Sequence, residues 1–168
     1  MADILYVCGF AVFGGSRLLL IRKARPAWQK RFLNGVGGHI EEGETIHEAM
    51  VREFREETGI ITEEVDWVRK LEYTHYNPPH VMPNSSAKVY YLVAELIEER
   101  NEEARDGSPG ETLWWQDLYR AGSTRLPYSI SPMEGIPMLP NLHWIIPLCL
   151  DTTIHGLVEI DATGDIMK

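Results

Sequence analysis

Three glutamates close together in one predicted helix could do chemistry that a single carboxylate cannot. Glu53, Glu56 and Glu57 lie in the segment REFREETGI, and a rotation of about 100° per residue brings them within roughly 100° of one another on a helix. Like charges at this spacing repel, although Arg52 and Arg55 offset part of the repulsion. A solvated surface of mixed charge is one interpretation of such a run. The other is a cage of oxygen ligands for Mg²⁺, whose charge removes the repulsion.

The wider spacing favours the second interpretation. Gly38 is followed by five residues, then Glu44, then seven residues and the segment above, with Phe54 and Ile60 at positions for bulky apolar side chains. This arrangement resembles, without a gap, the signature of the Nudix hydrolases, G-x5-E-x7-R-E-U-x-E-E-x-G-U, in which U is bulky and apolar. The seven fixed residue types would match by accident on the order of once in a million chains of this length. The resemblance implies hydrolysis of a nucleoside diphosphate linked to another group.

For the metal site, the resemblance implies ligands from the helix and from the loops beside it. Glu56 and Glu57 are expected to bind Mg²⁺ directly, with Mn²⁺ as a substitute, and Glu53 is either a third ligand or the general base. Gly37 is expected to add a carbonyl oxygen. Glu111, in a downstream acidic loop, is the candidate for a further ligand, with a merely solvated loop as the alternative. Mg²⁺ prefers oxygen ligands, bridges diphosphate oxygens and lowers the pKa of a bound water.

The resemblance also assigns positioning and substrate-binding roles. Arg52 is expected to pair with Glu44 and to orient a glutamate, and Gly38 to let the backbone approach the metal and the substrate. Beyond the signature, nearly the whole chain resembles the MutT-like branch, in particular the hydrolases of oxidised purine nucleoside triphosphates. The segment RLLLIRKARP places Lys23 where a phosphate-facing lysine is expected. The segment FLNGVGGHIEEGETI places Asn34 where an asparagine contacts a purine.

A C-terminal segment carries the third part of this resemblance. LPNLHWIIPLCL…HG is similar to the pattern W-P-D-D-x-x-W-F-P-L-L-L…H-G if one residue is inserted. It places Asn141 on the first acid and Trp144 on the second tryptophan, as substrate-binding residues. An asparagine amide suits this role because it offers a purine edge both a donor and an acceptor. The alternatives are that Asn34 caps a turn, that Asn141 caps a helix and that Trp144 belongs to the core.

The chain departs from the branch at three positions. Leu139 replaces the first tryptophan of the C-terminal pattern, Leu142 replaces its second acid, and His39 stands where a lysine is usual. In the branch that the chain resembles, a pair of acids in the C-terminal pattern recognises an oxidised base. The resemblance therefore supports release of pyrophosphate and a monophosphate from purine nucleoside triphosphates more strongly than selectivity for substrates of the 8-oxo-dGTP type.

Two other functions stay open. Nudix hydrolases also cleave ADP-ribose, nucleotide sugars and dinucleoside polyphosphates, and markers for these substrates lie downstream of the signature. Tyr76 falls near the dinucleoside marker, whereas Pro78 and Pro79 are late for the ADP-ribose marker. The function of a different class is a Nudix-fold binding module without catalysis, against which the complete set of acids and Arg52 argues.

Composition limits the setting of this chemistry. At 168 residues the chain fits one Nudix domain over residues 1–168, as a monomer or a homodimer. A net charge of −9 argues against a nucleic-acid polymer as partner, whereas Mg²⁺ between two anions allows a nucleotide. No apolar run reaches the ~18 residues needed to span a bilayer, and MADILYVCGFAVF lacks the basic start of a signal peptide. Cys8 and Cys149 lie in apolar segments and predict buried thiols in the cytoplasm, with a disulfide as the alternative.

The elements that must position these residues follow from periodicity and turn residues. One helix is predicted from a Thr45 cap to Thr58, with Gly59 as its stop, and a second over residues 141–150 with Pro147 inside it. Strands are predicted at 4–13, 17–23, 66–76, 88–96, 112–116 and 155–160. A basic loop is predicted at 22–31, which either steers the triphosphate inward or is merely solvated. The other predicted connections are loops at 77–86 and 97–110, a helical turn at 117–121 and an irregular segment at 124–140. The predicted fold class is α/β: a Nudix fold, an α/β/α sandwich with a mixed, mostly antiparallel central sheet.

Overall fold

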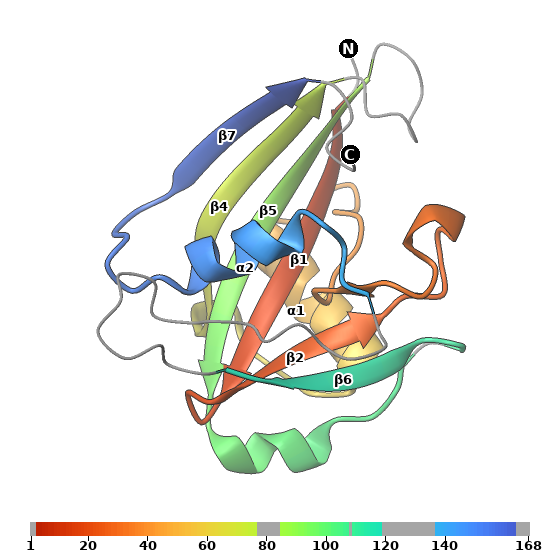
Figure 1. Cartoon of the computed structure of the whole chain (residues 1–168), viewed down its shortest axis with the longest axis vertical. Coiled ribbons are helices and arrows are strands. Elements are labelled where there is room, and N and C mark those ends of the chain that lie inside the picture. The colour runs from red at the N-terminus through yellow and green to blue at the C-terminus, as the bar shows by residue number, and fades with distance from the viewer. Residues whose placement is uncertain (1–2, 77–84, 108, 119–136, 164–168) are drawn as a thin grey trace.

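Seven strands form a single sheet that runs through the molecule (Figure 1). The structure, a computed structural model, describes residues 3–76, 85–107, 109–118 and 137–163. The strands follow the order β3-β2-β1-β5-β4-β7, and β6 pairs with β2 outside this path. Their bounds are β1 (Asp3–Phe13), β2 (Arg17–Arg22), β3 (Leu33–Asn34), β4 (Trp67–Tyr76), β5 (Ser86–Leu96), β6 (Thr112–Asp117) and β7 (Val158–Thr163).

The pairing of the strands confirms a mixed, mostly antiparallel sheet. β1 with β2, β2 with β3, β2 with β6, and β4 with β5 are antiparallel. β1 with β5 and β4 with β7 are parallel. The parallel pair at the centre is the longest, with register from Asp3 opposite Ser86 to Phe13 opposite Leu96.

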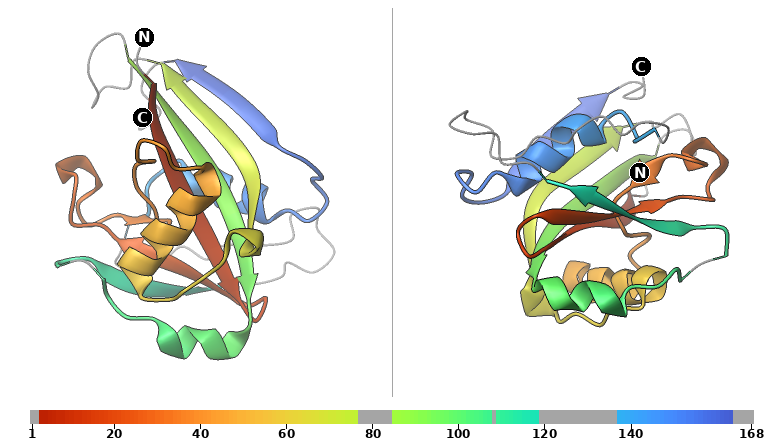
Figure 2. Two further views of the ribbon diagram at one scale, coloured as in Figure 1. Left: turned by 180° about the vertical axis from the view of Figure 1, so that it is seen from behind. Right: turned by 60° about the horizontal axis from the view of Figure 1, so that its bottom comes forward.

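One helix covers each face of the sheet, which confirms the predicted sandwich (Figure 2). α1 (Ile46–Thr58) packs Met50 and Phe54 into one core, and α2 (Leu142–Leu150) packs its apolar side chains into the other. Successive residues of a strand point to opposite faces. In β1, Phe10 therefore belongs to the α2 core and Ala11 to the α1 core. The nearly continuous apolar run of β1 follows from burial on both sides.

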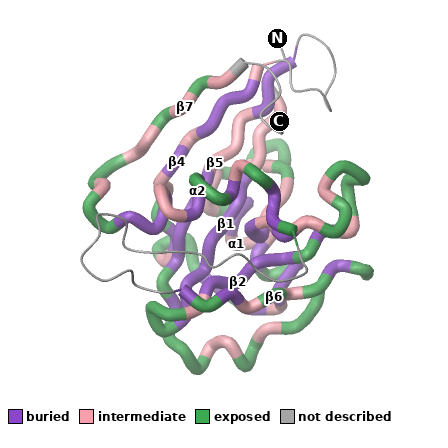
Figure 3. The backbone as a smooth tube through the Cα atoms, in the orientation of Figure 1, coloured by how far each residue is buried: buried purple, intermediate pink, exposed green. Residues whose placement is uncertain are grey.

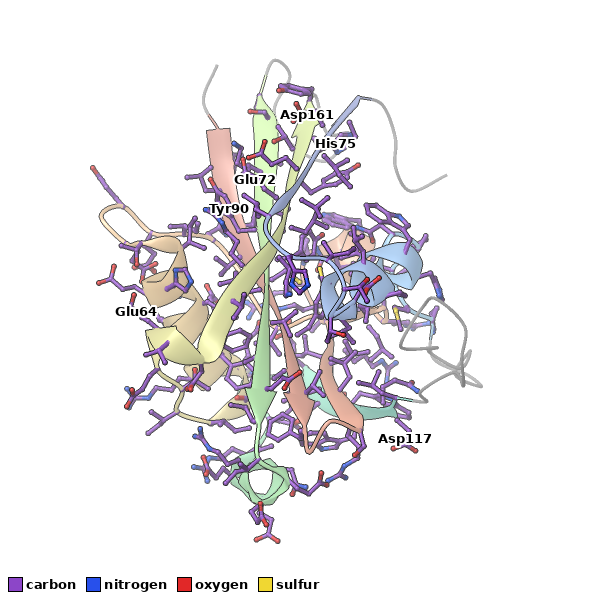
Figure 4. All side chains as sticks on the ribbon, turned by 90° about the vertical axis from the view of Figure 1, so that its left-hand side faces the viewer. Glu64, Glu72, His75, Tyr90, Asp117 and Asp161 are labelled. Atoms are coloured by element: carbon purple, nitrogen blue, oxygen red, sulfur yellow. The ribbon has the colours of Figure 1, made fainter. Side chains whose placement is uncertain are left out.

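The central strands are buried along much of their length, and the exposed residues gather on the connections and outer elements (Figure 3). Figure 4 shows the sheet nearly edge-on, with α1, beside Glu64, on one side and α2 on the other. Within the described ranges, no helix is long and apolar enough to cross a membrane.

Local side-chain chemistry sets both ends of α1. The Thr45 hydroxyl accepts a hydrogen bond from the Glu48 backbone N–H at 3.1 Å, and the Glu48 carboxylate accepts one from the Thr45 N–H at 2.8 Å. This reciprocal pair is a capping box, which satisfies two backbone donors at the start of a helix. Gly59 ends the helix in the left-handed conformation with φ of 76°. Both predicted ends of this helix are confirmed.

Several predicted boundaries are wrong in detail. β3 was not predicted, β5 begins at Ser86 rather than residue 88, and β7 covers Val158–Thr163 rather than 155–160. A short 3-10 helix, η3 (Glu98–Glu103), lies in the predicted solvated loop, and Asp117 ends β6 instead of beginning a helical turn. Two further 3-10 helices are η1 (Ala27–Gln29) and η2 (Glu64–Asp66). Pairing explains two of these: β5 is extended by its partner β1, and β3 exists through two pairs with β2.

Parts of three predictions fall outside the described residues. These are the loop over 77–84, the turn over 119–121 and the irregular segment over 124–136. Cys8 and Cys149 are buried free thiols, as predicted, and not a disulfide. Burial raises the pKa of both thiols, that of Cys149 to about 12.

Candidate active site

The glycine-rich loop after β3 continues the sheet along the first half of β1. Gly9 and Val36 exchange two backbone hydrogen bonds, of 2.7 and 3.2 Å, and the Val7 N–H donates to the Gly38 carbonyl at 2.9 Å. At Gly37 an added Cβ would lie 2.1 Å from the Val7 carbonyl oxygen, so a side chain does not fit. The loop is thereby held against the central strand, immediately before the chain enters α1.

Arg52 organises the exposed half of the site. Its guanidinium binds Glu44 with two hydrogen bonds, Nε to Oε1 at 2.6 Å and Nη2 to Oε2 at 2.9 Å. Nη1 donates to Glu53 Oε1 at 2.8 Å, and Nη2 also donates to the His39 carbonyl at 2.9 Å. The hydrogen bond from Arg52 lowers the pKa of Glu44, and the same contact raises the pKa of Arg52. The predicted pairing of Arg52 with Glu44 is confirmed, and Glu53 is the glutamate that Arg52 orients.

Gly38 and Glu53 are packed against each other. An added Cβ at Gly38 would lie 2.4 Å from Glu53 Oε1, so a side chain at this position would displace the Glu53 carboxylate. Glu56, one turn beyond Arg52, lies 3.6 Å from Arg52 Nη1 but has a side chain that is 60% exposed. Glu53 is therefore held in place by two neighbours, whereas Glu56 is free to reach a ligand in solvent.

The buried half of the site centres on the ammonium of Lys23. Its Nζ forms an ion pair with Glu57 Oε1, donates to the Gly37 carbonyl at 3.3 Å and lies 4.0 Å from Glu111 Oε2. The Gly37 N–H donates to Glu57 Oε2 at 3.0 Å, and the Ala24 N–H donates to Glu111 Oε1 at 3.3 Å. Burial raises the pKa of Glu57, while Lys23 and the Gly37 N–H oppose that rise. Glu111 is thus buried beside Glu57, not on a merely solvated loop.

The donor set of this half suits a hard divalent cation. Glu57, Glu111 and the Gly37 carbonyl present only oxygen atoms, and together they already surround one cationic group, the Lys23 ammonium. Glu53 and Glu57 turn toward different cations, Arg52 and Lys23. Accordingly, within the part of the chain that the structure describes, no three His, Cys, Asp or Glu side chains are grouped closely enough to form a metal site by themselves.

The loop predicted over residues 97–110 closes the C-terminal end of α1, a contact that sequence reasoning missed. The Arg105 N–H donates to the Thr58 carbonyl at 2.8 Å, and the Gly107 N–H donates to the Glu57 carbonyl at 3.1 Å. These bonds satisfy carbonyls that have no partner inside the helix. An added Cβ at Gly107 would lie 1.8 Å from the Glu56 carbonyl oxygen. The dipeptide Asp106-Gly107 is a turn signal, but nothing in the sequence indicates that this turn rests on α1.

Gly107→Ala is therefore expected to disturb the site through the backbone. The methyl group must push the loop away from α1, which costs about 1–3 kcal/mol of stability and shifts Glu111 relative to Glu57. We expect the affinity for Mg²⁺, the ion that the donor set suits, to fall about tenfold. The measurement is a calorimetric Mg²⁺ titration beside a thermal melt. Gly156→Ala is the matched control, because Gly156 has φ of 106° and open space around it, so its strain destabilises the protein away from the site. An unchanged Mg²⁺ affinity at Gly107→Ala would contradict this role.

The predicted base-contacting residue Asn34 has its amide engaged within the protein. Its Oδ1 accepts from the Gly35 N–H at 2.8 Å and from the Cys8 thiol at 3.8 Å. Its Nδ2 donates to Gln29 Oε1 at 3.3 Å. These are the contacts expected of an asparagine that caps a turn, which was the alternative prediction. The hydrogen bond to Gln29 determines the orientation of the Asn34 amide group.

Asn141 behaves differently. It stands at the N-cap of α2, as the helix-capping alternative places it, but its side chain makes no capping hydrogen bond. Its Oδ1 is buried and has no hydrogen-bond partner among the described residues. Trp144, one turn later, is 42% exposed and lies beside Tyr73 with ring centroids 6.0 Å apart, so it is not plain core.

Backbone contacts bring the two asparagines onto neighbouring segments. The Leu33 N–H donates to the Pro137 carbonyl at 2.9 Å, and the Leu139 N–H donates to the Leu33 carbonyl at 3.1 Å. Residues 137–139 therefore run parallel to β3, which contains Asn34, and lead directly to Asn141. Leu139 and Leu142, which stand in place of the pattern's aromatic and acid, are buried in the α2 core.

Comparisons with known proteins find similar sequences and a similar fold. The profile of the family described as NUDIX domain matches residues 4–126. The 8-oxo-dGTP diphosphatase of Escherichia coli (strain K12) is 29% identical over 118 residues, which cover 70% of this chain and 83% of that protein. An isopentenyl-diphosphate Delta-isomerase of Salmonella arizonae is 29% identical over 156 residues, which cover 89% of this chain and 76% of that protein. The crystal structure of a mutator MutT protein from Bacillus halodurans has a TM-score of 0.58 at 20% identity and covers 96% of this chain and 89% of that one, which shows a shared fold.

Proposed function

Because the chain belongs to the Nudix family of hydrolases, which act on phosphoric anhydride bonds and generally use divalent metal ions, we propose that it is a Mg²⁺-dependent pyrophosphohydrolase of purine nucleoside triphosphates. The observation that carries the proposal is the buried set of oxygen donors around one cationic group, formed by Glu57, Glu111 and the Gly37 carbonyl. A divalent ion that binds together with a triphosphate needs an anionic site in the protein that can hold a cation.

In this proposal the two halves of the site have different tasks. In the buried half, Glu57, Glu111 and the Gly37 carbonyl would hold the metal ion, and Glu56 would reach it from the exposed half. The ion, when bound, would neutralise phosphate charge and lower the pKa of a water. Glu53, oriented by Arg52 at 2.8 Å, accepts the proton of the attacking water or acts as a further ligand. Its position is supported by the hydrogen bond from Arg52 and by close packing against Gly38.

The phosphate chain is held by cationic side chains in the proposed complex. Lys23 stabilises the negative charge that develops as the bond to pyrophosphate breaks. The basic loop of residues 22–31, which contains Lys23, contributes favourable electrostatic steering of the triphosphate.

The purine is proposed to lie against Asn141 and Trp144. A buried amide oxygen without a partner costs free energy that a ligand's donor recovers, and among the described residues Asn141 Oδ1 is such an atom. An amino group or ring N–H of a purine supplies that donor, and the exposed indole of Trp144 offers a stacking surface. Leu142, at 1% exposure, offers an oxidised base no hydrogen bond. We therefore expect little preference for 8-oxo-dGTP over dGTP.

A substrate panel tests the proposal. With Mg²⁺, purine nucleoside triphosphates are expected to give a nucleoside monophosphate and pyrophosphate at the highest kcat/KM. The panel includes pyrimidine triphosphates, 8-oxo-dGTP, ADP-ribose, nucleotide sugars, dinucleoside polyphosphates and isopentenyl diphosphate. Turnover of ADP-ribose, a nucleotide sugar or a dinucleoside polyphosphate alone would replace the proposed substrate class, and isomerisation without release of pyrophosphate would replace the reaction. A protein that takes up Mg²⁺ and nucleotide without turnover would be a binding module.

Asn141→Ala gives the sharpest test of the base site. Loss of one base contact is worth about 1–3 kcal/mol, so kcat/KM for purine nucleoside triphosphates is expected to fall by roughly 5- to 150-fold. Pyrimidine triphosphates are the internal control, because their kcat/KM should change much less if Asn141 reads the purine edge. A similar loss for both classes would assign Asn141 to the structure of α2 rather than to base recognition.

A further inference from the structure

Lys23 makes its polar contacts to the groups that are proposed to bind the metal. Its ammonium pairs with Glu57, donates to the Gly37 carbonyl at 3.3 Å and lies 4.0 Å from Glu111 Oε2. Its side chain is 9% exposed, and those of Glu57 and Glu111 are 9% and 7% exposed. The charge of one buried lysine thus offsets part of the repulsion between two buried carboxylates.

The backbone on which Lys23 stands is fixed. Its N–H donates to the Phe32 carbonyl at 3.1 Å, and its carbonyl accepts from the Arg31 N–H at 3.0 Å. The next residue, Ala24, donates to Glu111 at 3.3 Å. Because these bonds hold the chain on both sides, only the flexible four-carbon side chain of Lys23 is able to move the ammonium.

We propose that Lys23 is a built-in counter-ion that a divalent cation displaces when it binds, and that the displaced ammonium then pairs with the phosphates of the substrate. The proposal rests on the proposed function, because it takes Glu57, Glu111 and the Gly37 carbonyl as metal ligands. Two cations among the same few oxygen atoms repel each other strongly in a buried site. The ammonium must therefore give up its contacts with these oxygens before they bind the metal.

This exchange links metal binding to phosphate binding. Without a phosphate, the displaced ammonium loses its ion pair with Glu57 and gains only solvent. With a phosphate beside the metal, the ammonium gains a new anionic partner. The cation and the polyphosphate each therefore bind more tightly when the other is present, and Lys23 carries that coupling.

The Lys23→Met variant tests the exchange by the direction of its effect. Methionine removes the competing charge at similar volume, so the affinity for Mg²⁺ alone, measured by calorimetry at mildly alkaline pH without nucleotide, is expected to rise about tenfold or more. The KM for nucleoside triphosphate is expected to rise as well, because the phosphate partner is lost. A lysine that merely supports the structure would instead weaken Mg²⁺ binding on removal, and an equal or weaker affinity in Lys23→Met would overturn the proposal.

The matched control is Lys70→Met. It makes the same change in net charge, but Lys70 acts on Cys149 and Asp151 at the end of α2, on the other face of the sheet. Its affinity for Mg²⁺ should equal that of the wild type. If the wild type takes up no Mg²⁺, the proposed function itself is contradicted. If the wild type takes up Mg²⁺ but Lys23→Met has no higher affinity for it, only the proposed exchange is contradicted.

A measurement on the unaltered protein covers the case in which Lys23→Met does not fold. Lysine acetylation followed by mass spectrometry should find Lys23 protected in a buffer without divalent cations and several-fold more reactive with saturating Mg²⁺. Lys30, which is exposed in the basic loop, serves as the reference and should react equally in both. Protection of Lys23 that persists with Mg²⁺ would overturn the displacement.

Discussion

Exchange of Glu57 for glutamine is expected to lower kcat for hydrolysis about a thousandfold, because the proposed metal ligand would lose its charge at the point where several kcal/mol of charge stabilisation would be supplied. Glu57 also connects α1 to Lys23 and to the glycine-rich loop. Its two oxygens accept from Lys23 and from the Gly37 N–H, the latter at 3.0 Å. Glutamine keeps one acceptor but turns its amino group toward a donor, which costs about 1–3 kcal/mol of stability.

Steady-state kinetics with a pyrophosphate readout and calorimetry with Mg²⁺ measure this effect. Glu56→Gln is expected to act in the same direction through the same loss of ligand charge. Glu102→Gln, at an exposed position of η3, is the matched control and should leave both measurements unchanged. Activity within tenfold of the wild type in both Glu57→Gln and Glu56→Gln would contradict the assignment of these residues as metal ligands.

The second large effect is expected at Arg52→Lys, although the substitution keeps the charge. Arg52 uses three nitrogens at once, two on Glu44 and one on Glu53, and it also contacts the His39 carbonyl. A lysine ammonium cannot reproduce this fork. Loss of a residue that orients metal ligands typically costs about 10- to 100-fold in activity or metal affinity. We expect kcat to fall by that amount and the thermal midpoint to fall with it.

Arg55→Lys is the control for this variant, because Arg55 lies on the same helix and is exposed. The double variant Arg52→Lys with Glu44→Gln separates positioning from simple loss of stability. If Arg52 acts by way of Glu44, the second change should add little to the first. Fully additive losses would show that the two residues contribute independently.

Local sequence information is sufficient for the elements whose causes are local. α1 was predicted with its correct ends because Thr45 and Glu48 cap its start and Gly59 ends it. The apolar spacing of Met50 and Phe54 correctly placed its buried face. The ion pair of Arg52 with Glu44 followed from the resemblance, because spacing within one short segment determines it.

Features that depend on contacts between distant segments were not predictable in this way. β3 is two residues long and is a strand only because β2 pairs with it. The contact of Lys23 with Glu57 joins residues 34 positions apart, and nothing in either segment specifies the partner. The closure of α1 by Arg105 and Gly107 likewise depends on where the chain returns, so the acidic loop was interpreted as merely solvated.

The connection between residues 137–139 and Leu33 has a consequence for how such an enzyme diversifies. The acids, Arg52 and Lys23 are tied to β1, β2 and α1, whereas Asn141 and Trp144 stand on a segment that joins this framework at the edge formed by β3. Exposed side chains of α2, such as that of Trp144, can therefore change without moving the groups that are proposed to cleave the anhydride. Divergence of the molecule toward new bases would then leave its reaction chemistry intact.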